Sequence, residues 1–243
     1  MLANRASTNR TGRATRVAAL YDIHGNLPAL DAVLAEVDAD LIVVGGDVVV
    51  GPWPSETLER LRGLGDRARF IRGNADRELV DASAGLAPPE LLDFVRDRLT
   101  DEQLAFVAAW PPTETVEVPD TGQVLFCHAT PRSDEEILTR ISPDERWREA
   151  LDGVDAHVVV CGHTHVQFDR RIGDVRLVNA GSVGMPYEDA VGAYWLQLGP
   201  AIEFRLTEYD PGDIAAAGWP QDWPSATPEE ATELFERWSR EGT

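Results

Sequence analysis

The sequence predicts a single α/β domain, and three observations support this prediction. Short apolar runs with the length of buried strands alternate with stretches of helical periodicity, which is the element order of α/β proteins. The chain has 243 residues, 43% of them hydrophobic, so it can form one substantial core. Five runs end at polar side chains that can bind metals. Because ligands bind at the carboxyl ends of strands in open α/β sheets, we expect these ends to form one crevice.

The five runs and the polar residues after them define the candidate site. The runs cover residues 17–21, 41–44, 70–72, 124–127 and 158–161, and the side chains that follow them are Asp22, His24, Asp47, Asn74, His128, His163 and His165. His163 and His165 are one residue apart, so in an extended chain they point to the same side. Four of the five histidines in the chain lie at these strand ends. This distribution indicates a shared metal site.

Each of these side chains has an ordinary structural explanation when it is considered alone. Asp22 can stabilise a turn, Asp47 or Asn74 can cap a helix, and His128 can be a core histidine bonded to the backbone. Independent structural roles do not explain seven such residues at five strand ends. Seven nitrogen and oxygen donors are too many for one tetrahedral ion, but they divide between two ions if one carboxylate bridges them.

Composition limits the classes of partner. The formal net charge is −20 and the sequence pI is about 4.5, so we expect the surface to repel long nucleic acids. No apolar run approaches the roughly 20 residues of a membrane span, and no hydrophobic core of a signal peptide is present. We therefore expect a cytoplasmic protein with no membrane partner. Cys127 and Cys161 end apolar runs and are expected to be buried thiols, not disulfides.

Capping residues and helical periodicity place helices between the strands. Asn26 caps the first helix, Ser55 begins the second, and residues 88–110 form two more, the last of them capped by Thr100. A capping box with proline at the first helical position predicts a further helix that begins at Ser142.

The second half of the chain is expected to be richer in hairpins. Turn residues at 119–122, 173–174 and 199–200 each join two strand-like runs. Within residues 202–207 apolar and polar side chains alternate, which predicts a strand with its apolar face in the core and its polar face in water.

Three segments are distinguished along the chain. Residues 1–15 are basic and polar with no apolar period, so we expect a disordered tail. Residues 16–210 form the predicted domain. Residues 211–243 are predicted to be a linker and an amphipathic helix, whose stripe with Phe235 and Trp238 packs on the domain or on a second copy in a homodimer. We expect the tryptophans to pack rather than to stack on bases.

The order of the candidate ligands resembles that of the calcineurin-like metallophosphoesterase family. The family pattern is D-x-H, then G-D, then G-N-H-D or G-N-H-E, then a single H, then G-H-x-H, and every metal-binding position is filled over residues 16–182. The small bacterial phosphodiesterases are most similar, because residues 179–182 resemble their N-P-G-S segment. The resemblance implies a two-sheet β-sandwich flanked by helices, in four αββα layers, and two divalent ions such as manganese, iron or zinc.

The resemblance also implies roles for individual residues. Asp47 is the family's bridging ligand; Asp22, His24 and His165 complete the first metal, and Asn74, His128 and His163 complete the second. The residues expected to take part in catalysis are Asp47, Asn74, His128, Asp76 and Arg132. Asp76 is expected to support a ligand or to cap a helix. Arg132 is expected either to contact substrate or to form a surface ion pair.

One position departs from the family pattern. The family usually has a histidine after the G-N asparagine, where it protonates the leaving group or stabilises charge, but Ala75 occupies this position. Loss of a general acid commonly costs about 10²- to 10⁴-fold in rate. We therefore expect a preference for good leaving groups, or a substitute donor such as Arg77, Arg132 or water on the metals. His157 is a poor candidate, since about 20 Å of extended chain separates it from His163.

These considerations predict a phosphoesterase that attacks small phosphodiesters with a metal-bridging hydroxide, in preference to monoesters. Two divalent ions can generate hydroxide at neutral pH, direct it at phosphorus and balance the charge of the transition state. Dinucleoside polyphosphates and phosphoproteins are alternative substrates that would need the same metals. A non-catalytic scaffold, such as the retromer subunit with this fold, is the alternative from another class; Ala75 agrees with it, whereas the complete set of ligands argues against it.

Overall fold

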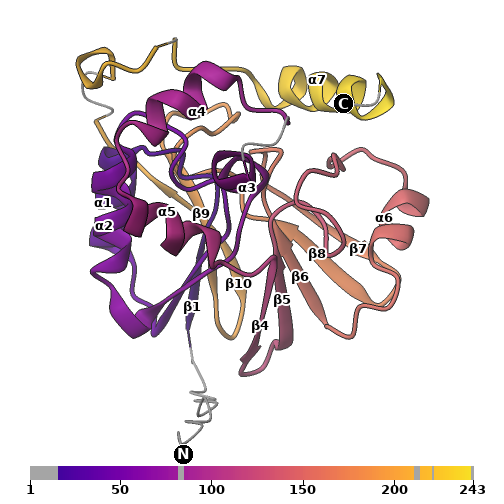
Figure 1. Cartoon of the computed structure of the whole chain (residues 1–243). Helices are drawn as coiled ribbons and strands as arrows, with labels where there is room; N and C mark the ends of the chain where they lie inside the picture. Colours follow the sequence, from indigo (N-terminus) through magenta and orange to yellow (C-terminus); the bar gives the residue numbers. More distant parts are fainter. Residues whose placement is uncertain (1–15, 82–84, 211–213, 221, 242–243) are drawn as a thin grey trace, which may run out of the picture.

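The computed structural model describes residues 16–81, 85–210, 214–220 and 222–241, and it contains two β-sheets packed face to face with helices on their outer faces (Figure 1). The first sheet has the strand order β10-β9-β1-β2-β3, and the second has the order β4-β5-β6-β8-β7. The predicted two-sheet sandwich flanked by helices is thereby confirmed.

The first sheet is built around parallel strands joined by helices. Its strands are β1 (Val17–Leu20), β2 (Leu41–Val44), β3 (Ala68–Phe70), β9 (Ala193–Leu198) and β10 (Ile202–Thr207). β1 pairs in parallel with β2 and β2 with β3, while β9 pairs antiparallel with both β1 and β10. The helices α1 (Leu27–Glu36) and α2 (Pro54–Arg62) connect the parallel strands. The carboxyl ends of β1, β2 and β3 therefore lie at one edge of the sheet.

The second sheet combines parallel strands with two hairpins. Its strands are β4 (Thr113–Val118), β5 (Gly122–Cys127), β6 (Val158–Cys161), β7 (Phe168–Ile172) and β8 (Val175–Asn179). β5, β6 and β8 are parallel, and the β4–β5 and β7–β8 hairpins lie at the two edges. These two hairpins and the β9–β10 hairpin occur at the turns that the sequence predicts. The apolar β6 is the central strand of this sheet.

The remaining helices cover the sheets and the ends of the strands. They are α3 (Asn74–Asp81), α4 (Pro89–Arg96), α5 (Asp101–Ala108), α6 (Asp144–Ala150) and α7 (Pro228–Glu241), with 3-10 turns at Gly65–Arg67 and Ala215–Ala217. The side chain of Asn26 caps α1, and Thr100 forms a capping box with Gln103 on α5, as predicted. The capping box predicted at Ser142 is wrong, because its hydroxyl donates to Glu236 of α7 and α6 has no side-chain cap.

Three buried clusters produce the layered architecture. The first lies between the first sheet and its helices and includes Leu30 and Trp195. The second, with Tyr21 and Phe126, fills the space between the two sheets. In the third, Trp147 of α6 packs on the second sheet. Each fully buried large apolar side chain contributes about 1.5–3 kcal/mol. The sheets therefore provide a rigid base for the loops at their carboxyl ends. Cys127 and Cys161 are free and buried, as expected.

The prediction for residues 202–207 is wrong about which side chains are buried. Phe204 and Leu206 remain 40% and 43% exposed, whereas Thr207 is buried and its hydroxyl donates to Glu36 of α1. β10 is an edge strand, and α1 contacts it. Most of both faces of β10 is therefore exposed, and Thr207 is its one buried residue. No helix in the described ranges is both long enough and apolar enough to cross a membrane.

Candidate metal centre

The predicted ligands follow the strands of both sheets and converge at one end of the sandwich. Asp22 and His24 follow β1, Asp47 follows β2, Asn74 begins α3 just after β3, His128 follows β5, and His163 and His165 follow β6. Five of them have left-handed backbone: φ is 51° at Asp22, 48° at His24, 51° at Asp47, 66° at His163 and 56° at His165. Residues other than glycine adopt this region rarely, and such strain is concentrated at functional sites.

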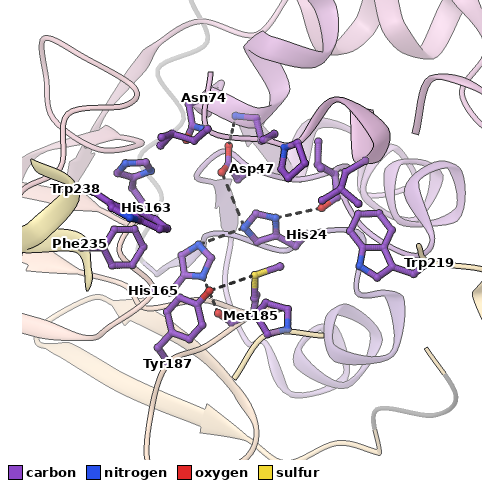
Figure 2. Close-up of a pocket in the computed structure, with 17 residues that line it drawn as sticks. His24, Asp47, Asn74, His163, His165, Met185, Tyr187, Trp219, Phe235 and Trp238 are labelled. Carbon is purple, nitrogen blue, oxygen red and sulfur yellow. Dashed lines mark hydrogen bonds and ion pairs between the residues drawn. The ribbon is translucent and has the colours of Figure 1, made fainter. Parts of the chain in front are cut away.

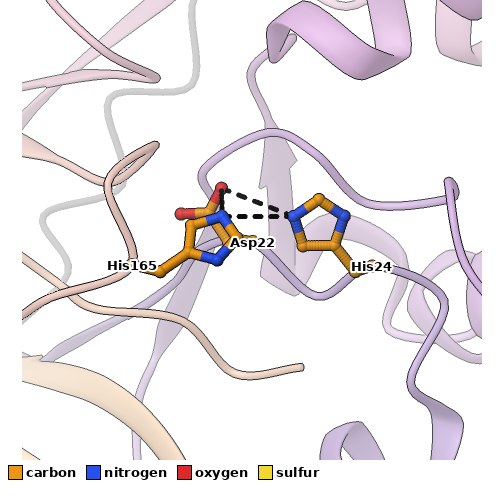
Figure 3. A group of neighbouring side chains, drawn as sticks. All are labelled: Asp22, His24 and His165. Carbon is orange, nitrogen blue, oxygen red and sulfur yellow. Dashed lines mark hydrogen bonds and ion pairs between the residues drawn. The ribbon is translucent and has the colours of Figure 1, made fainter. Parts of the chain in front are cut away.

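The first group of ligands consists of Asp22, His24 and His165 (Figure 3). The Nε2 atom of His165 lies 3.3 Å from Asp22 Oδ1, and the Nε2 atom of His24 lies 4.0 Å from the same oxygen. The two Nε2 atoms are 3.3 Å apart. The potential ligand atoms of all three side chains thus face one point, which is the arrangement of a candidate metal site.

The second group consists of Asp47, His128 and His163. His128 Nε2 lies 3.5 Å from Asp47 Oδ2, and the rings of His128 and His163 meet edge to face. The two groups adjoin, because His128 Nε2 is 3.8 Å from Asp22 Oδ1 and His24 Nε2 is 4.0 Å from Asp47 Oδ2. These distances give two neighbouring candidate metal sites with carboxylates between them.

Backbone carbonyls orient three of the imidazoles. The Nδ1 atom of His24 lies 3.2 Å from Val50 O, that of His128 lies 2.9 Å from Gly45 O, and that of His165 lies 2.7 Å from Met185 O. A proton on Nδ1 satisfies each carbonyl and leaves Nε2 unprotonated toward the centre. Metal-binding histidines commonly have this second hydrogen bond, which fixes the tautomer and the ring orientation.

The donor set fits two divalent ions. Four buried polar atoms on predicted ligands have no hydrogen-bond partner within the protein: Asp22 Oδ1, Asn74 Oδ1, His128 Nε2 and His163 Nε2. Buried polar groups are nearly always satisfied, so several orphans together need an explanation. Metal coordination would satisfy all four. The set contains no thiolate and suits manganese, iron, zinc or a similar ion.

Buried charges shift the proton affinities of the ligands strongly. Burial opposes charge on both groups, but Asp47 and Asp22 raise the pKa of His128 to about 10, and His128 together with its neighbours holds the pKa of Asp47 well below its usual range. Burial, followed by the charge of His128, lowers the pKa of His163 to about 4. The buried carboxylates of Asp22 and Asp47 therefore favour positive charge in this part of the centre.

A cavity of about 310 Å³ lies directly over these ligands (Figure 2). Its floor includes His24, Asp47, Asn74, His163 and His165, and its walls are Val50, Ala75, Leu86, Ala87, Pro88, Leu91, Met185, Tyr187, Trp219, Pro224, Phe235 and Trp238. Small-molecule sites are typically concave and mainly apolar, with a few polar groups that converge, and this volume is near the lower end of their range. The cavity can therefore hold a small ligand against the candidate metals.

A model of the calcineurin-like phosphoesterase superfamily domain matches residues 16–197. The chain belongs to this superfamily. Two symmetrical bis(5'-nucleosyl)-tetraphosphatases are similar to it. That of Janthinobacterium sp. (strain Marseille) is 33% identical over 46% of this chain and 42% of its own length. That of Klebsiella pneumoniae (strain 342) is 30% identical over 51% of this chain and 46% of its own length. The chain thus spans less than half the length of these relatives.

Solved structures agree with the fold of this calcineurin-like phosphoesterase. A metallophosphoesterase from Sphaerobacter thermophilus superposes with a TM-score of 0.68 at 23% identity, covering 91% of this chain and 98% of that one. A hypothetical protein from Pyrococcus horikoshii OT3 superposes with a TM-score of 0.74 at 19% identity, covering 90% and 97%. At these identities the similarity shows the fold.

The calcineurin-like phosphoesterase places the other predicted catalytic residues away from the cavity. Asp76 is fully buried, and its carboxylate accepts hydrogen bonds from the backbone N–H groups of Val48 and Gly73, 3.0 and 3.1 Å away. Burial and the nearby charge of Asp47 raise the pKa of Asp76 to about 7. Asp76 thus joins the loop after β2 to the start of α3, and both roles considered from the sequence, support of a ligand and a helix cap, stay open.

Neither arginine considered as a proton donor lines the cavity. Arg132 forms the surface ion pair that the sequence left as one of two alternatives, with Glu136 as its partner at 2.6 Å. Arg77 pairs with Asp134 at 2.9 Å and with Glu135 at 2.6 Å. Ala75 does line the cavity, at the position where the family usually has histidine.

Two features of the centre were not predicted from the sequence. Glu78 is fully buried and accepts a hydrogen bond from Asn74 Nδ2 at 3.1 Å, so that Asn74 Oδ1 stays free. Trp219 and Trp238 line the cavity, although we expected the tryptophans to serve only in packing. Their position cannot be derived from local patterns, because they lie far from the ligand motifs in the sequence.

Proposed function

We propose that this calcineurin-like phosphoesterase is a metal-dependent phosphodiesterase that hydrolyses small phosphodiesters, and that it acts in the cytoplasm. The observation that carries the proposal is the convergence of seven predicted ligand side chains at one end of the sandwich. Five of them form the floor of one small cavity, and four atoms of the seven side chains are buried and unpartnered. Structural roles for these residues would leave those four atoms unsatisfied.

The residues of the centre have distinct tasks in this proposal. Asp22, His24 and His165 would hold the first ion, Asn74, His128 and His163 would hold the second, and Asp47 would contribute to both. When bound, two divalent ions would supply a nucleophile at neutral pH and would balance the charge that develops at phosphorus. Asp47 is positioned by the backbone N–H of Ala75, which donates to Oδ1 at 2.9 Å, while Oδ2 faces the histidines.

The walls of the cavity favour diesters over monoesters. None of the described residues that line it is an arginine, and the chain contains no lysine. A monoester carries close to two negative charges at neutral pH, whereas a diester carries one. A diester therefore needs fewer cationic side chains, in addition to the metals, to balance its charge. The small volume and the cover of α7 also favour a small substrate over a phosphoprotein. A homodimer stays a prediction.

Hydrolysis by the manganese-loaded protein tests the proposal. We expect turnover of bis(p-nitrophenyl) phosphate to exceed that of p-nitrophenyl phosphate, with about two metal ions bound per chain by elemental analysis. His163→Ala should lower turnover at least about 10²-fold, since it removes a metal ligand. His157→Ala is the matched control, because His157 is exposed and lies outside the cavity. Bound metal without turnover of any activated ester would instead support a scaffold.

A further inference from the structure

Part of the cavity wall comes from a segment outside the residues that match the family model. The match ends at residue 197, whereas Trp219, Pro224, Phe235 and Trp238 all line the cavity. The metal ligands lie within the matched residues, so the chemistry is common to the family. The C-terminal segment contributes three aromatic rings to the cavity wall above the predicted ligands.

Neighbouring rings hold these aromatic walls in place. Trp219 meets Phe94 of α4 edge to face at 5.3 Å, and Phe235 meets Trp238 edge to face at 5.5 Å. Tyr187 stacks on the metal-site residue His165 with 5.2 Å between ring centroids. In Figure 2, Trp219 lies on one side of the cavity and Phe235 and Trp238 lie on the other, with the histidines between them. Rings held in this way present an ordered surface to a ligand.

The polarity of the cavity restricts what can bind between these rings. Its charged lining group, apart from the histidines, is the carboxylate of Asp47, and no arginine is present among the described residues of the lining. A single phosphodiester charge can be balanced by the metals. A polyphosphate chain would bring several further charges against apolar walls, where no cationic side chain compensates them.

We infer that the cavity selects phosphodiesters with one phosphate and a flat aromatic substituent, either an aryl group or a nucleobase. The ring packs among Trp219, Phe235 and Trp238 while the phosphate lies over the metal ligands. Stacking on aromatic side chains is tolerant of ring identity, since every base or aryl group has a π face. This inference rests on the proposed function, and it differs from the polyphosphate specificity named for the tetraphosphatase relatives.

Binding of phosphodiesters to the manganese-loaded full chain, measured by calorimetry, tests the inference. Diphenyl phosphate and diethyl phosphate have the same charge and differ in their rings, and 3',5'-cyclic AMP tests a nucleobase. We expect diphenyl phosphate or cyclic AMP to bind at least about tenfold tighter than diethyl phosphate, a typical effect of stacking. Equal binding of all three, or tighter binding of diadenosine tetraphosphate, would overturn the inference.

Variants of the walls separate the contribution of the rings from that of the fold. Trp238→Ala should remove most of the preference for ring-bearing esters and leave diethyl phosphate binding within about twofold. Trp219→Leu keeps an apolar side chain at its position and should have the same effect on binding. This second variant allows the test to be made even if Trp238→Ala does not fold. Trp53→Ala is the matched control for Trp238→Ala, since Trp53 is half-buried like Trp238 but does not line the cavity. Retention of the preference in both wall variants would overturn the inference.

The outcome also distinguishes this inference from the proposed function. Tight binding of ring-bearing diesters without hydrolysis of any ester would support the aromatic site and contradict the phosphodiesterase. Hydrolysis of activated diesters without tighter binding of ring-bearing esters would support the phosphodiesterase and contradict the aromatic site.

Discussion

At the scale of single residues, the metal centre depends on backbone conformations that few residues adopt. Five predicted ligands have positive φ, and glycines beside them allow the loops to approach closely. A Cβ on Gly162 would clash with Asp22 Oδ2, and a Cβ on Gly73 would clash with Asp47 Oδ1. The ligands are therefore placed by the loops that carry them as much as by their own side chains.

Ala75→His tests whether a proton donor is missing from the centre. Ala75 lines the cavity, and its contact with Asp47 uses the backbone N–H, which the substitution retains. We expect the rate for diesters with alkoxide leaving groups to rise at least about tenfold, because these groups need a proton as they depart. The rate for p-nitrophenyl esters should change little, since p-nitrophenolate leaves as an anion. Steady-state kinetics would measure the ratio of variant to parent rates for both ester types. An equal ratio for both would contradict the claim that a proton donor is missing.

Glu78 is predicted to position the second metal site through Asn74. Its carboxylate accepts from Asn74 Nδ2 and also from the backbone N–H groups of Leu86 and Ala87, which line the cavity. Loss of a hydrogen-bond partner of a metal ligand typically costs about 10- to 100-fold in metal affinity or activity. We expect Glu78→Ala to weaken binding of one manganese ion by this amount in a calorimetric titration.

Two variants control this experiment. Glu78→Gln retains an oxygen acceptor for Asn74 and should recover most of the affinity. Glu90→Ala removes an exposed carboxylate from the neighbouring helix α4 and should leave both metal affinities unchanged. If Glu78→Ala bound two ions as tightly as the parent chain, Asn74 would not depend on Glu78.

At the scale of elements, local patterns predicted the elements well and their tertiary contacts less well. The five ligand-bearing strands, the caps at Asn26 and Thr100 and the three hairpins follow from residues adjacent in sequence. The hydroxyl of Ser142 was assigned to a helix cap but contacts a helix about ninety residues away. A local pattern contains no information about such a partner.

The helix α7 is held on the domain by a buried carboxylate. Glu236 accepts hydrogen bonds from the hydroxyls of Thr139 and Ser142, and the adjacent Phe235 packs with Val166 over the cavity. Glu236→Ala would leave two buried hydroxyls without their acceptor, at about 1–3 kcal/mol each. We expect α7 to exchange its amide hydrogens faster in this variant and the KM for ring-bearing diesters to rise.

The same helix offers controls for that prediction. Glu236→Gln keeps an acceptor oxygen and should restore slow exchange, whereas Glu233→Ala changes an exposed carboxylate on α7 and should have no effect. Unchanged exchange in Glu236→Ala would show that apolar contacts alone hold the helix.

At the scale of the whole molecule, the predicted metal ligands follow strands of both sheets, and the C-terminal segment adds aromatic side chains to the cavity wall. The sequence predicts seven ligands, because each follows a strand in a recognisable order, and the structure brings six of them together in two groups. The sequence did not place Trp219, Phe235 and Trp238 over them, since only the folded chain brings residues after 210 back to the strand ends. Chemistry could therefore be predicted from motifs, whereas substrate preference depends on tertiary structure.

Metal binding should stabilise the entire fold, because the ligands link both sheets. Ions that bind only the native state at about 100 times their Kd add about 2.7 kcal/mol, which corresponds to a rise in Tm of roughly 5–10 °C for a domain of this size. Differential scanning calorimetry with manganese and with a chelator would measure this difference. His163→Ala should reduce the rise, whereas His157→Ala should retain it. Since buried carboxylates and imidazoles remain unsatisfied without metal, an identical Tm in both conditions would contradict the assignment of the centre.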